Sequence, residues 1–141
     1  LFYMLDRTEQ SYSYGPLSVA SNALKLPNDM YLQYPHLRYG NGEFLYDSGR
    51  NGITRTHGPR LVENIVQALA RIVITDQMLA IQNIPGVSVV LTVHDEIIAL
   101  GSDKNADETL ATIMAIMKQP PAWCTELPLD AEGAYSKIYN K

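Results

Sequence analysis

Residues 87–100 read VSVVLTVHDEIIAL, and this stretch decides the fold. Five of its first seven residues, from Val87 to Val93, are valine or threonine, whose branched side chains favour strands. The stretch is apolar again from Ile97 to Leu100, and the polar residues His94, Asp95 and Glu96 lie between. Two apolar strands around a short polar break predict an antiparallel hairpin with these three residues at its tip.

A long helix is predicted before the hairpin, from Pro59 to Asn83, where Pro85-Gly86 stops it. Its apolar residues recur at helical spacing, which predicts a mostly buried helix. These residues are Leu61, Ile65, Leu69, Ile72 and Leu79, with Val62, Val66 and Val73 beside them. A second helix is predicted from Asp107 to Lys118, with Asn105 as its cap. Its apolar stripe is Leu110, Ile113, Met114 and Met117.

One narrow polar ridge runs along the first helix. It consists of Arg60, Asn64, Gln67 and Arg71, at positions i, i+4, i+7 and i+11. The simplest interpretation is a stripe that faces solvent. The alternative is a surface that binds a nucleic-acid backbone or minor groove through amide and guanidinium donors.

The rest of the chain adds strands. The first third is rich in tyrosine and in turn signals, and Met30–Tyr39 and Glu43–Asp47 flank Gly40-Asn41-Gly42 as a second hairpin. Near the end, Leu127, Leu129 and Ala131 alternate with polar or proline positions, which predicts a final short strand. Strands mixed with helices around an antiparallel hairpin predict an α+β fold.

Composition limits the class of protein. A chain of 141 residues is one domain by length, and its net charge of −4 argues against a nucleic-acid binder that relies on bulk positive charge. The single cysteine, Cys124, excludes an internal disulfide and favours a reducing compartment. No apolar run approaches the ~18 residues of a membrane span, so no membrane partner is expected. The run from Leu1 to Leu5 lacks a start signal, which suggests that the front is missing.

The tip of the predicted hairpin is the best candidate for chemistry. Mg²⁺ prefers one or two protein carboxylates together with phosphates and water, and Asp95 could serve with a second acid from elsewhere. The plain alternative is that aspartate is a common turn residue. His36 and His57 lie in turn-rich segments and are expected at the surface, and Cys124 beside Trp123 is expected to be an inert packed thiol.

Four segments, in order, resemble family A DNA polymerases, the group of bacterial polymerase I and many phage replicases. Leu91–Ile98 resembles the third palm motif, in which a strand carries Val-His-Asp-Glu into a hairpin turn. Arg60–Arg71 resembles the long palm helix of phage-type members with its glutamine motif. Leu26–Arg38 is similar to a strand segment of the same sequences, and Leu127–Gly133 to their final strand.

The resemblance implies template-directed addition of deoxynucleotides to a primer 3′ end, with two Mg²⁺ ions in a polymerase palm. By position, Asp95 matches a metal-holding aspartate, Glu96 an auxiliary carboxylate and His94 a histidine near the primer terminus. Gln67 matches the glutamine that faces the duplex minor groove, and Arg71, Arg60 and Asn64 are candidate DNA contacts on the same ridge. The implied partners are primer–template DNA and deoxynucleoside triphosphates, in the cytoplasm of a bacterial or phage-infected cell.

The resemblance also implies a division of the chain. Residues 1–58 would be a segment between fingers and palm, and residues 59–141 the palm with the glutamine helix and the His-Asp-Glu hairpin. The family's second aspartate and its nucleotide-binding fingers helix are missing, so the fragment alone is expected to be inactive. Bacterial members have an asparagine four residues before the glutamine, where this chain has Glu63.

Three alternatives compete with this interpretation. A single-subunit RNA polymerase palm shares the histidine-aspartate hairpin, but Glu96 and the glutamine helix favour the DNA enzyme. A metal phosphohydrolase of the HD type places histidine and aspartate on helices, whereas Val87–Val93 is predicted to be a strand. A non-catalytic nucleic-acid-binding module is the right class if the chain occurs in nature as it stands.

Overall fold

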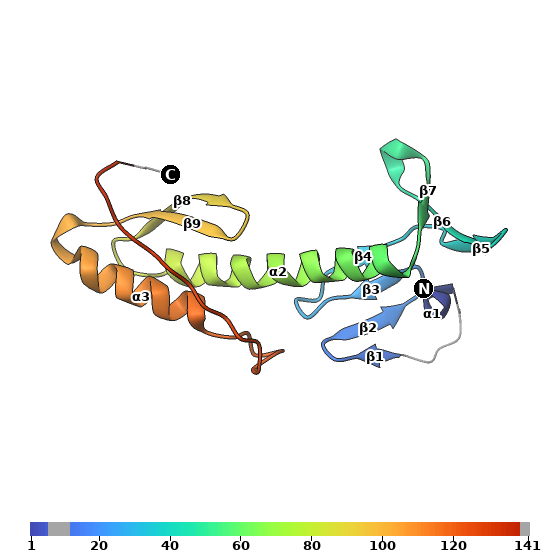
Figure 1. Ribbon diagram of the computed structural model, residues 1–141, viewed down its shortest axis with the longest axis horizontal. Coiled ribbons are helices and arrows are strands. Elements are labelled where there is room, and N and C mark those ends of the chain that lie inside the picture. The colour runs from blue at the N-terminus through green and yellow to red at the C-terminus, as the bar shows by residue number, and fades with distance from the viewer. Residues whose placement is uncertain (6–11, 139–141) are drawn as a thin grey trace. The chain divides into compact units, whose positions relative to one another are not determined.

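The computed structural model describes residues 1–5 and 12–138 and has helices together with antiparallel sheets (Figure 1). The α+β prediction is therefore confirmed. The chain forms two compact units, Leu1–Arg71 and Ile72–Lys141, and the boundary between them falls inside the long helix α2 (Gly58–Gln82). Each unit is described by itself below.

The first unit begins with the short helix α1 (Phe2–Leu5) and a four-stranded antiparallel sheet. Its strands are β1 (Ser13–Tyr14), β2 (Leu17–Ala20), β3 (Ala23–Lys25) and β4 (Tyr31–Gln33), and they pair in chain order. The turn between β2 and β3 contains Asn22 with φ +57°, a conformation that asparagine tolerates better than most residues. The tyrosine-rich first third is therefore strand-rich, as predicted.

A second sheet of three antiparallel strands follows in the same unit. It consists of β5 (Arg38–Gly40), β6 (Glu43–Asp47) and β7 (Ile53–Thr56), with the 3-10 turn η1 (Gly49–Asn51) between the last two. The predicted hairpin around Gly40-Asn41-Gly42 is confirmed. The predicted strand over 30–39 is wrong as one element, because it splits into β4 and β5, which belong to different sheets. Pro35 and the positive φ of His36 (+53°) break the run.

The core of this unit gathers around Tyr34. Met4, Leu24, Tyr34 and Leu37 form a buried cluster, and Leu61 and Ile65 of α2 pack against it. Tyr34 is only 2% exposed, and its ring meets the Tyr46 ring edge to face at 5.1 Å. The first turns of α2 are therefore fixed to the sheets of this unit.

Helix α2 agrees with the predicted range of 59–83 to within a residue at each end. The prediction that it is mostly buried is wrong. Its buried side chains are Ile72, Ile74, Gln77 and Ile81, whereas Val62, Val66 and Leu79 are more than half exposed. The prediction from the sequence took one side of the helix to be covered by other elements along its whole length. In the second unit the buried positions Ile74, Gln77 and Ile81 follow a different stripe, which includes a polar residue.

By length and composition alone, α2 could also cross a membrane. An 18-residue window of the helix reaches a mean hydropathy of 1.2, and 22% of that window is buried. This corrects the expectation that no apolar run approaches such a length, since apolar residues interrupted mostly by uncharged polar ones still give a high average. It is weak evidence for a membrane, because helices of soluble proteins pass the same test.

The second unit contains the hairpin and a second helix. Strands β8 (Ser88–Val93) and β9 (Glu96–Leu100) pair antiparallel, and η2 (Asp103–Asn105) leads into α3 (Ala106–Lys118). The predicted helix is confirmed, with Asn105 at the cap position. The predicted capping bond is wrong, because the Asn105 side chain makes no cap hydrogen bond. The preceding 3-10 turn is instead closed by Ser102, whose hydroxyl accepts from the Lys104 backbone N–H.

Residues 119–138, here called the tail, lie along α3 without forming a described strand. Lys118 and Asp130 form an ion pair of 2.7 Å, the Tyr135 hydroxyl donates to Asp107 at 3.0 Å, and Lys137 lies 3.8 Å from Asp103. Between these contacts, a Cβ at Gly133 would stand 3.0 Å from Leu110 Cδ1 and 2.9 Å from Met114 Sδ. The predicted strand over 127–131 is therefore wrong, because an extended segment that lies on a helix has no strand to pair with.

Candidate active-site hairpin and nucleic-acid interface

The hairpin β8–β9 turns through two residues. Val93 pairs with Glu96, so His94 and Asp95 form the whole loop and Glu96 belongs to β9. The favoured two-residue hairpin turns need a positive φ at their first residue, and His94 has φ +54°. The predicted hairpin is confirmed, but its loop has two residues instead of the three expected, and a non-glycine residue takes the position that suits glycine best.

The three residues at the tip are free to meet a ligand. His94, Asp95 and Glu96 are all exposed, and no hydrogen bond or ion pair to the residues that the structure describes occupies the carboxylates of Asp95 and Glu96. Within residues 1–5 and 12–138, no three His, Cys, Asp or Glu side chains come close enough to hold a metal ion together. The tip thus offers carboxylate oxygens without a complete metal-binding set.

The strand that enters the tip carries a β-bulge. Val89 pairs with Ala99 and Leu91 with Ile98, so Val90 is an extra residue in β8. A bulge of this kind increases the local twist and is common beside functional sites, where it redirects a side chain. Val90 and Leu91 remain about half exposed on the same strand.

On α2, Gln67 and Glu63 form the exposed part of the predicted ridge. The Gln67 Nε2 amide donates a hydrogen bond of 3.3 Å to Glu63 Oε1 one turn earlier. Both side chains are exposed, so the pair is presented to solvent as a unit. Glutamine with an acidic residue at this spacing is a known stabilising pair on helix surfaces, and the spacing alone could have predicted it.

Asn64 differs from the other ridge residues, which corrects the prediction of one solvent-facing set. Its Nδ2 donates a hydrogen bond of 2.9 Å to the hydroxyl of the buried Tyr34, 30 residues away. Burial raises the pKa of the Tyr34 hydroxyl, and the bond from Asn64 opposes that rise in part. Asn64 therefore ties α2 to the core of its unit, and its amide nitrogen is already engaged.

Arg60 and Arg71 are exposed on α2, as the ridge prediction requires. The Arg60 backbone N–H donates to His57 Nδ1 at 3.3 Å, so the ring of His57 caps the start of the helix. His57 is exposed, as expected, but its capping role was not predicted. A polar side chain three residues before a free N–H of the first turn is the signal that could have found it.

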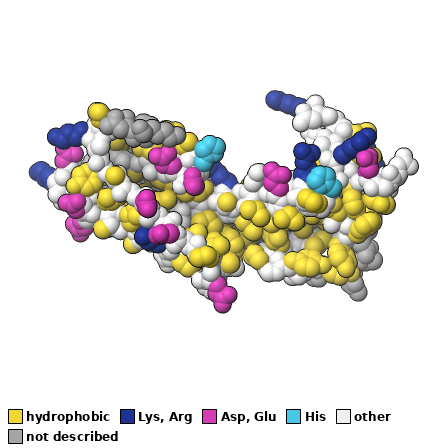
Figure 2. Space-filling view, viewed as in Figure 1, with side chains coloured by type: hydrophobic (Ala, Val, Ile, Leu, Met, Phe, Trp, Pro, Cys, Tyr) yellow, Lys and Arg dark blue, Asp and Glu magenta, His cyan; other side chains and the backbone are white. Residues whose placement is uncertain are grey.

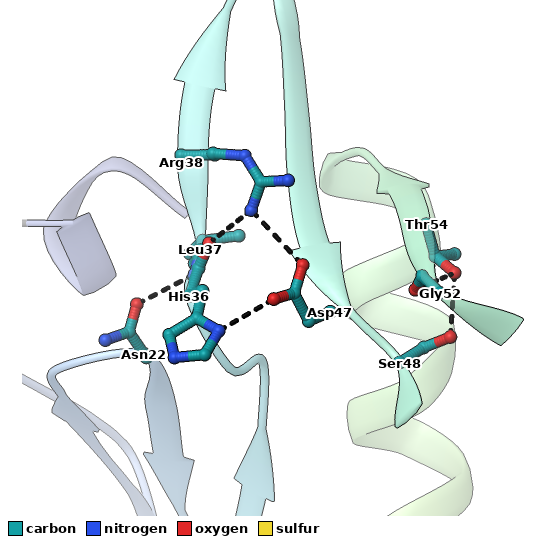
Figure 3. A network of polar contacts seen from close by, with 8 residues as sticks. All are labelled: Asn22, His36, Leu37, Arg38, Asp47, Ser48, Gly52 and Thr54. Atoms are coloured by element: carbon teal, nitrogen blue, oxygen red, sulfur yellow. Dashed lines mark hydrogen bonds and ion pairs between the residues drawn. The ribbon is translucent and has the colours of Figure 1, made fainter. Parts of the chain in front are cut away.

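A polar network that was not predicted from the sequence joins the two sheets of the first unit (Figure 3). The Asp47 carboxylate accepts from His36 Nδ1 at 2.7 Å and from Arg38 at 3.3 Å, and the Asp47 N–H donates to the Pro35 carbonyl. The bond from His36, followed by that from Arg38, lowers the pKa of the Asp47 carboxyl. Asn22 Oδ1 accepts from the Leu37 N–H at 3.0 Å. The network fixes residues 35–38, the segment that directly follows the buried Tyr34.

Cys124 is half-buried, in agreement with a packed thiol. Its neighbour Trp123 has a buried indole Nε1 with no partner among the described residues. No chemistry at this position is indicated.

The two units differ in net charge. All six arginines of the chain lie within residues 1–71, whereas nine of the fifteen acidic residues lie within 72–141. Figure 2 shows Asp and Glu side chains over the unit that contains α3 and the hairpin, and Lys and Arg side chains over the strands β5–β7. Residues 1–71 also contain six acidic residues, so this unit is close to neutral, whereas residues 72–141 contain four lysines and are net acidic.

The chain is similar to a phage protein. The chain is 36% identical over 128 residues to the DNA polymerase of Bacillus phage SP02, and the match covers 84% of this chain and 19% of that protein. The chain thus spans about a fifth of the length of the relative. No family model matches the chain, and no solved structure matches it significantly.

The match includes the candidate site. Since 84% of 141 residues is about 118, a continuous match leaves about 23 residues out and contains both Gln67 and the hairpin wherever it begins. This similarity relates the chain to a phage DNA polymerase.

Proposed function

We propose that this chain is part of a family A DNA polymerase and takes part in template-directed DNA synthesis. The observation that carries the proposal is the two-residue hairpin, which presents His94, Asp95 and Glu96 at an exposed tip within the region similar to a phage DNA polymerase. Residues 1–58 would connect fingers and palm, and residues 59–141 would form part of the palm.

Asp95 would hold the metal in this proposal. A hairpin tip fixes a side chain better than a long loop, and both oxygens of the exposed Asp95 carboxylate are unengaged among the described residues. Mg²⁺ takes one or two protein carboxylates and completes its shell with substrate phosphates, so the donor set fits. When bound, Mg²⁺ supplies charge neutralisation for the transfer of a phosphoryl group. Glu96 would add negative charge beside it, and His94 would lie near the primer 3′ end.

The DNA duplex would lie against α2. Gln67 would contact the minor groove, and Arg60 and Arg71 would contact the phosphate backbone. Because the Asn64 amide nitrogen donates to Tyr34, Asn64 would have a structural role, and Gln67, Arg60 and Arg71 would make the DNA contacts. The partners would be primer–template DNA and deoxynucleoside triphosphates, in the cytoplasm of a bacterial or phage-infected cell.

A chimera tests the proposal. This chain replaces the matched fifth of the phage SP02 polymerase, and primer extension is measured under single-turnover conditions. Asp95→Asn keeps the shape of the side chain and removes its charge, and it should lower the rate on the order of 10³-fold, about 4 kcal/mol of transition-state stabilisation. Glu96→Gln should have a smaller effect, and Glu126→Gln on the tail is the control for a lost acidic charge.

Two outcomes would contradict the proposal. The first is an Asp95→Asn chimera that is folded, by circular dichroism, and extends primers within about threefold of the parent. The second is primer extension by the 141-residue chain alone, free of host polymerase, because the chain lacks a second metal-holding aspartate and a nucleotide-binding helix.

A further inference from the structure

The hairpin β8–β9 is packed against its unit at its root. Val87, just before β8, is 7% exposed, and Ile81, in the last turn of α2, is fully buried. A Cβ at Gly101, just after β9, would stand 3.6 Å from the Thr109 side chain of α3 and 4.0 Å from that of Val87. Apolar contacts therefore hold both ends of the hairpin.

The strands beyond the root are covered much less. Every residue of β8 and β9 is exposed or half-buried, and Val90, Leu91 and Leu100 are each about half exposed or more. A two-stranded hairpin is at best marginally stable in water, so its conformation depends on support from other elements. Contacts close to the root therefore determine the direction in which the hairpin extends.

Gln82 makes a polar contact at this place. It is the last residue of α2, and its side-chain Oε1 accepts a hydrogen bond of 2.9 Å from the Val89 backbone N–H. Val89 directly precedes the bulge at Val90, where the ladder is disrupted and a strand bends most readily. The bond therefore joins β8 to α2 on the root side of the bulge.

A small change of direction at Val89 becomes a large displacement at the tip. His94 lies five residues further on, and a strand rises about 3.3 Å per residue, so the tip is roughly 15 Å away. A tilt of about 10° over that length moves the tip by roughly 3 Å. A misplacement of about 1 Å can already slow a reaction on the order of 100-fold.

We propose that Gln82 is a positioning residue, whose hydrogen bond to Val89 fixes the direction of the hairpin and thereby places the Asp95 carboxylate for metal binding. The inference rests on the proposed function, because it needs Asp95 to hold the metal. It adds to that function a residue outside the tip, which acts on Asp95 through the backbone of β8.

Three substitutions separate the hydrogen bond from other effects. Gln82→Met keeps the length of the side chain and removes the amide oxygen. Gln82→Glu keeps an oxygen in the same place, and an ionised carboxylate accepts a hydrogen bond from a backbone N–H. Gln119→Met makes the first exchange again at an exposed residue that follows α3, and it is the matched control.

The first measurement needs no catalysis. Nuclear magnetic resonance of the 141-residue chain follows hydrogen exchange at the Val89 amide and the backbone order parameters of His94 and Asp95. In Gln82→Met the Val89 amide should exchange about 2- to 10-fold faster, and the order parameters at the tip should fall. Gln82→Glu and Gln119→Met should behave like the parent chain.

The second measurement is single-turnover primer extension by the chimera with the phage SP02 polymerase. Gln82→Met should lower the rate constant about 10- to 100-fold and raise the Mg²⁺ concentration that gives half the maximal rate. The affinity for primer–template should stay the same. A residue that only stabilises the fold would lower the amplitude, which counts folded molecules, and would leave the rate constant and the Mg²⁺ dependence unchanged.

The outcomes separate the inference from the proposed function. An Asp95→Asn chimera that is as active as its parent overturns the proposed function and the inference with it. If Asp95 proves essential, the inference alone is overturned by a Gln82→Met variant with the parent rate constant or an equally ordered tip. It is also overturned if Gln82→Glu is as slow as Gln82→Met. The expected result is a loss in Gln82→Met that Gln82→Glu restores and Gln119→Met does not show.

Discussion

The side-chain amide of Asn64 donates a 2.9 Å hydrogen bond to the hydroxyl of Tyr34, which is only 2% exposed. One residue comes from the second turn of α2 and the other from the segment between two sheets. This bond sets which side of α2 turns inward in the first unit and so leaves Glu63 and Gln67 on the outside.

Tyr34→Phe should destabilise the chain by about 1–2 kcal/mol. The ring and its packing stay, but the half-buried amide of Asn64 loses its acceptor, and leaving a partner unsatisfied costs more than the bond itself contributes. Urea denaturation followed by circular dichroism measures the change. Tyr39→Phe, on a ring that is 49% exposed, serves as the control and should change stability little. Equal effects of the two substitutions would contradict the structural role of Asn64.

Asp47 should make the stability of the chain depend on acid pH. The bonds from His36 and Arg38 hold the folded-state pKa of the Asp47 carboxyl below its usual value of 3.8. A group with a lowered pKa contributes its full stability above the unfolded-state pKa and loses it as the pH falls through the folded-state pKa. Asp47→Asn should therefore lower stability at neutral pH and flatten its loss below about pH 4.

Denaturation measured from pH 2 to pH 7 checks this expectation. Asp95→Asn is the matched control, because no hydrogen bond or ion pair to a described residue holds that exposed carboxylate. An acid dependence that is the same in Asp47→Asn and in the parent chain would show that the network of Figure 3 adds no stability.

His94→Gly should stabilise the hairpin by up to about 1 kcal/mol while harming the proposed activity. Glycine adopts a positive φ at no steric cost, whereas histidine at φ +54° does so at a cost that exceeds the entropy lost by glycine. Asp95→Gly, one residue later and without a positive φ, should destabilise instead. Melting temperatures of both variants give the answer, and a large loss of stability in His94→Gly would show that the histidine ring packs on the hairpin.

Gln77→Met should cost about 1–3 kcal/mol, although methionine is apolar and of similar length. Gln77 is 8% exposed and its Nε2 donates at 2.8 Å to the carbonyl of Met117, in the last turn of α3. That carbonyl has no partner inside its own helix, so the substitution leaves it without a protein donor. Gln82→Met, at an exposed position of the same helix, is the comparison. If Gln77→Met left the free energy of unfolding unchanged, this would mean that water replaces the amide as the donor to the Met117 carbonyl.

Local patterns in the sequence predicted the parts of the fold that neighbouring residues determine. The β-branched run before His94 and the helical spacing after Pro59 gave the hairpin and α2 nearly to the residue. The burial of α2 could not be predicted in this way, because the side of a helix that becomes buried depends on the elements that pack against it. Asn64 is the clearest case, since its partner Tyr34 lies 30 residues away.

The candidate site was predictable to a similar extent. The tip residues His94, Asp95 and Glu96 follow from a strand pattern and a resemblance, and the structure brings them together at the turn. The network of His36, Arg38 and Asp47 was not predictable, because its members meet only after β5 and β6 have paired. The strand expected near Leu127 failed for a related reason, since alternation shows that a segment is extended and not which element it lies on.

The tail along α3 has a consequence for the order in which this part of the chain comes apart. Its contacts are nested: Lys118 with Asp130 lies innermost, Leu110 with Gly133 and Asp107 with Tyr135 follow, and Asp103 with Lys137 lies outermost. Each outer contact closes a long loop if it forms alone, but only a short one once the contact inside it is in place, so the innermost contact should form first and the outermost should open first. The tail should therefore dock on α3 progressively, beginning at the turn after α3. An exopeptidase that digests from the C-terminus should remove these contacts one at a time, beginning with the outermost.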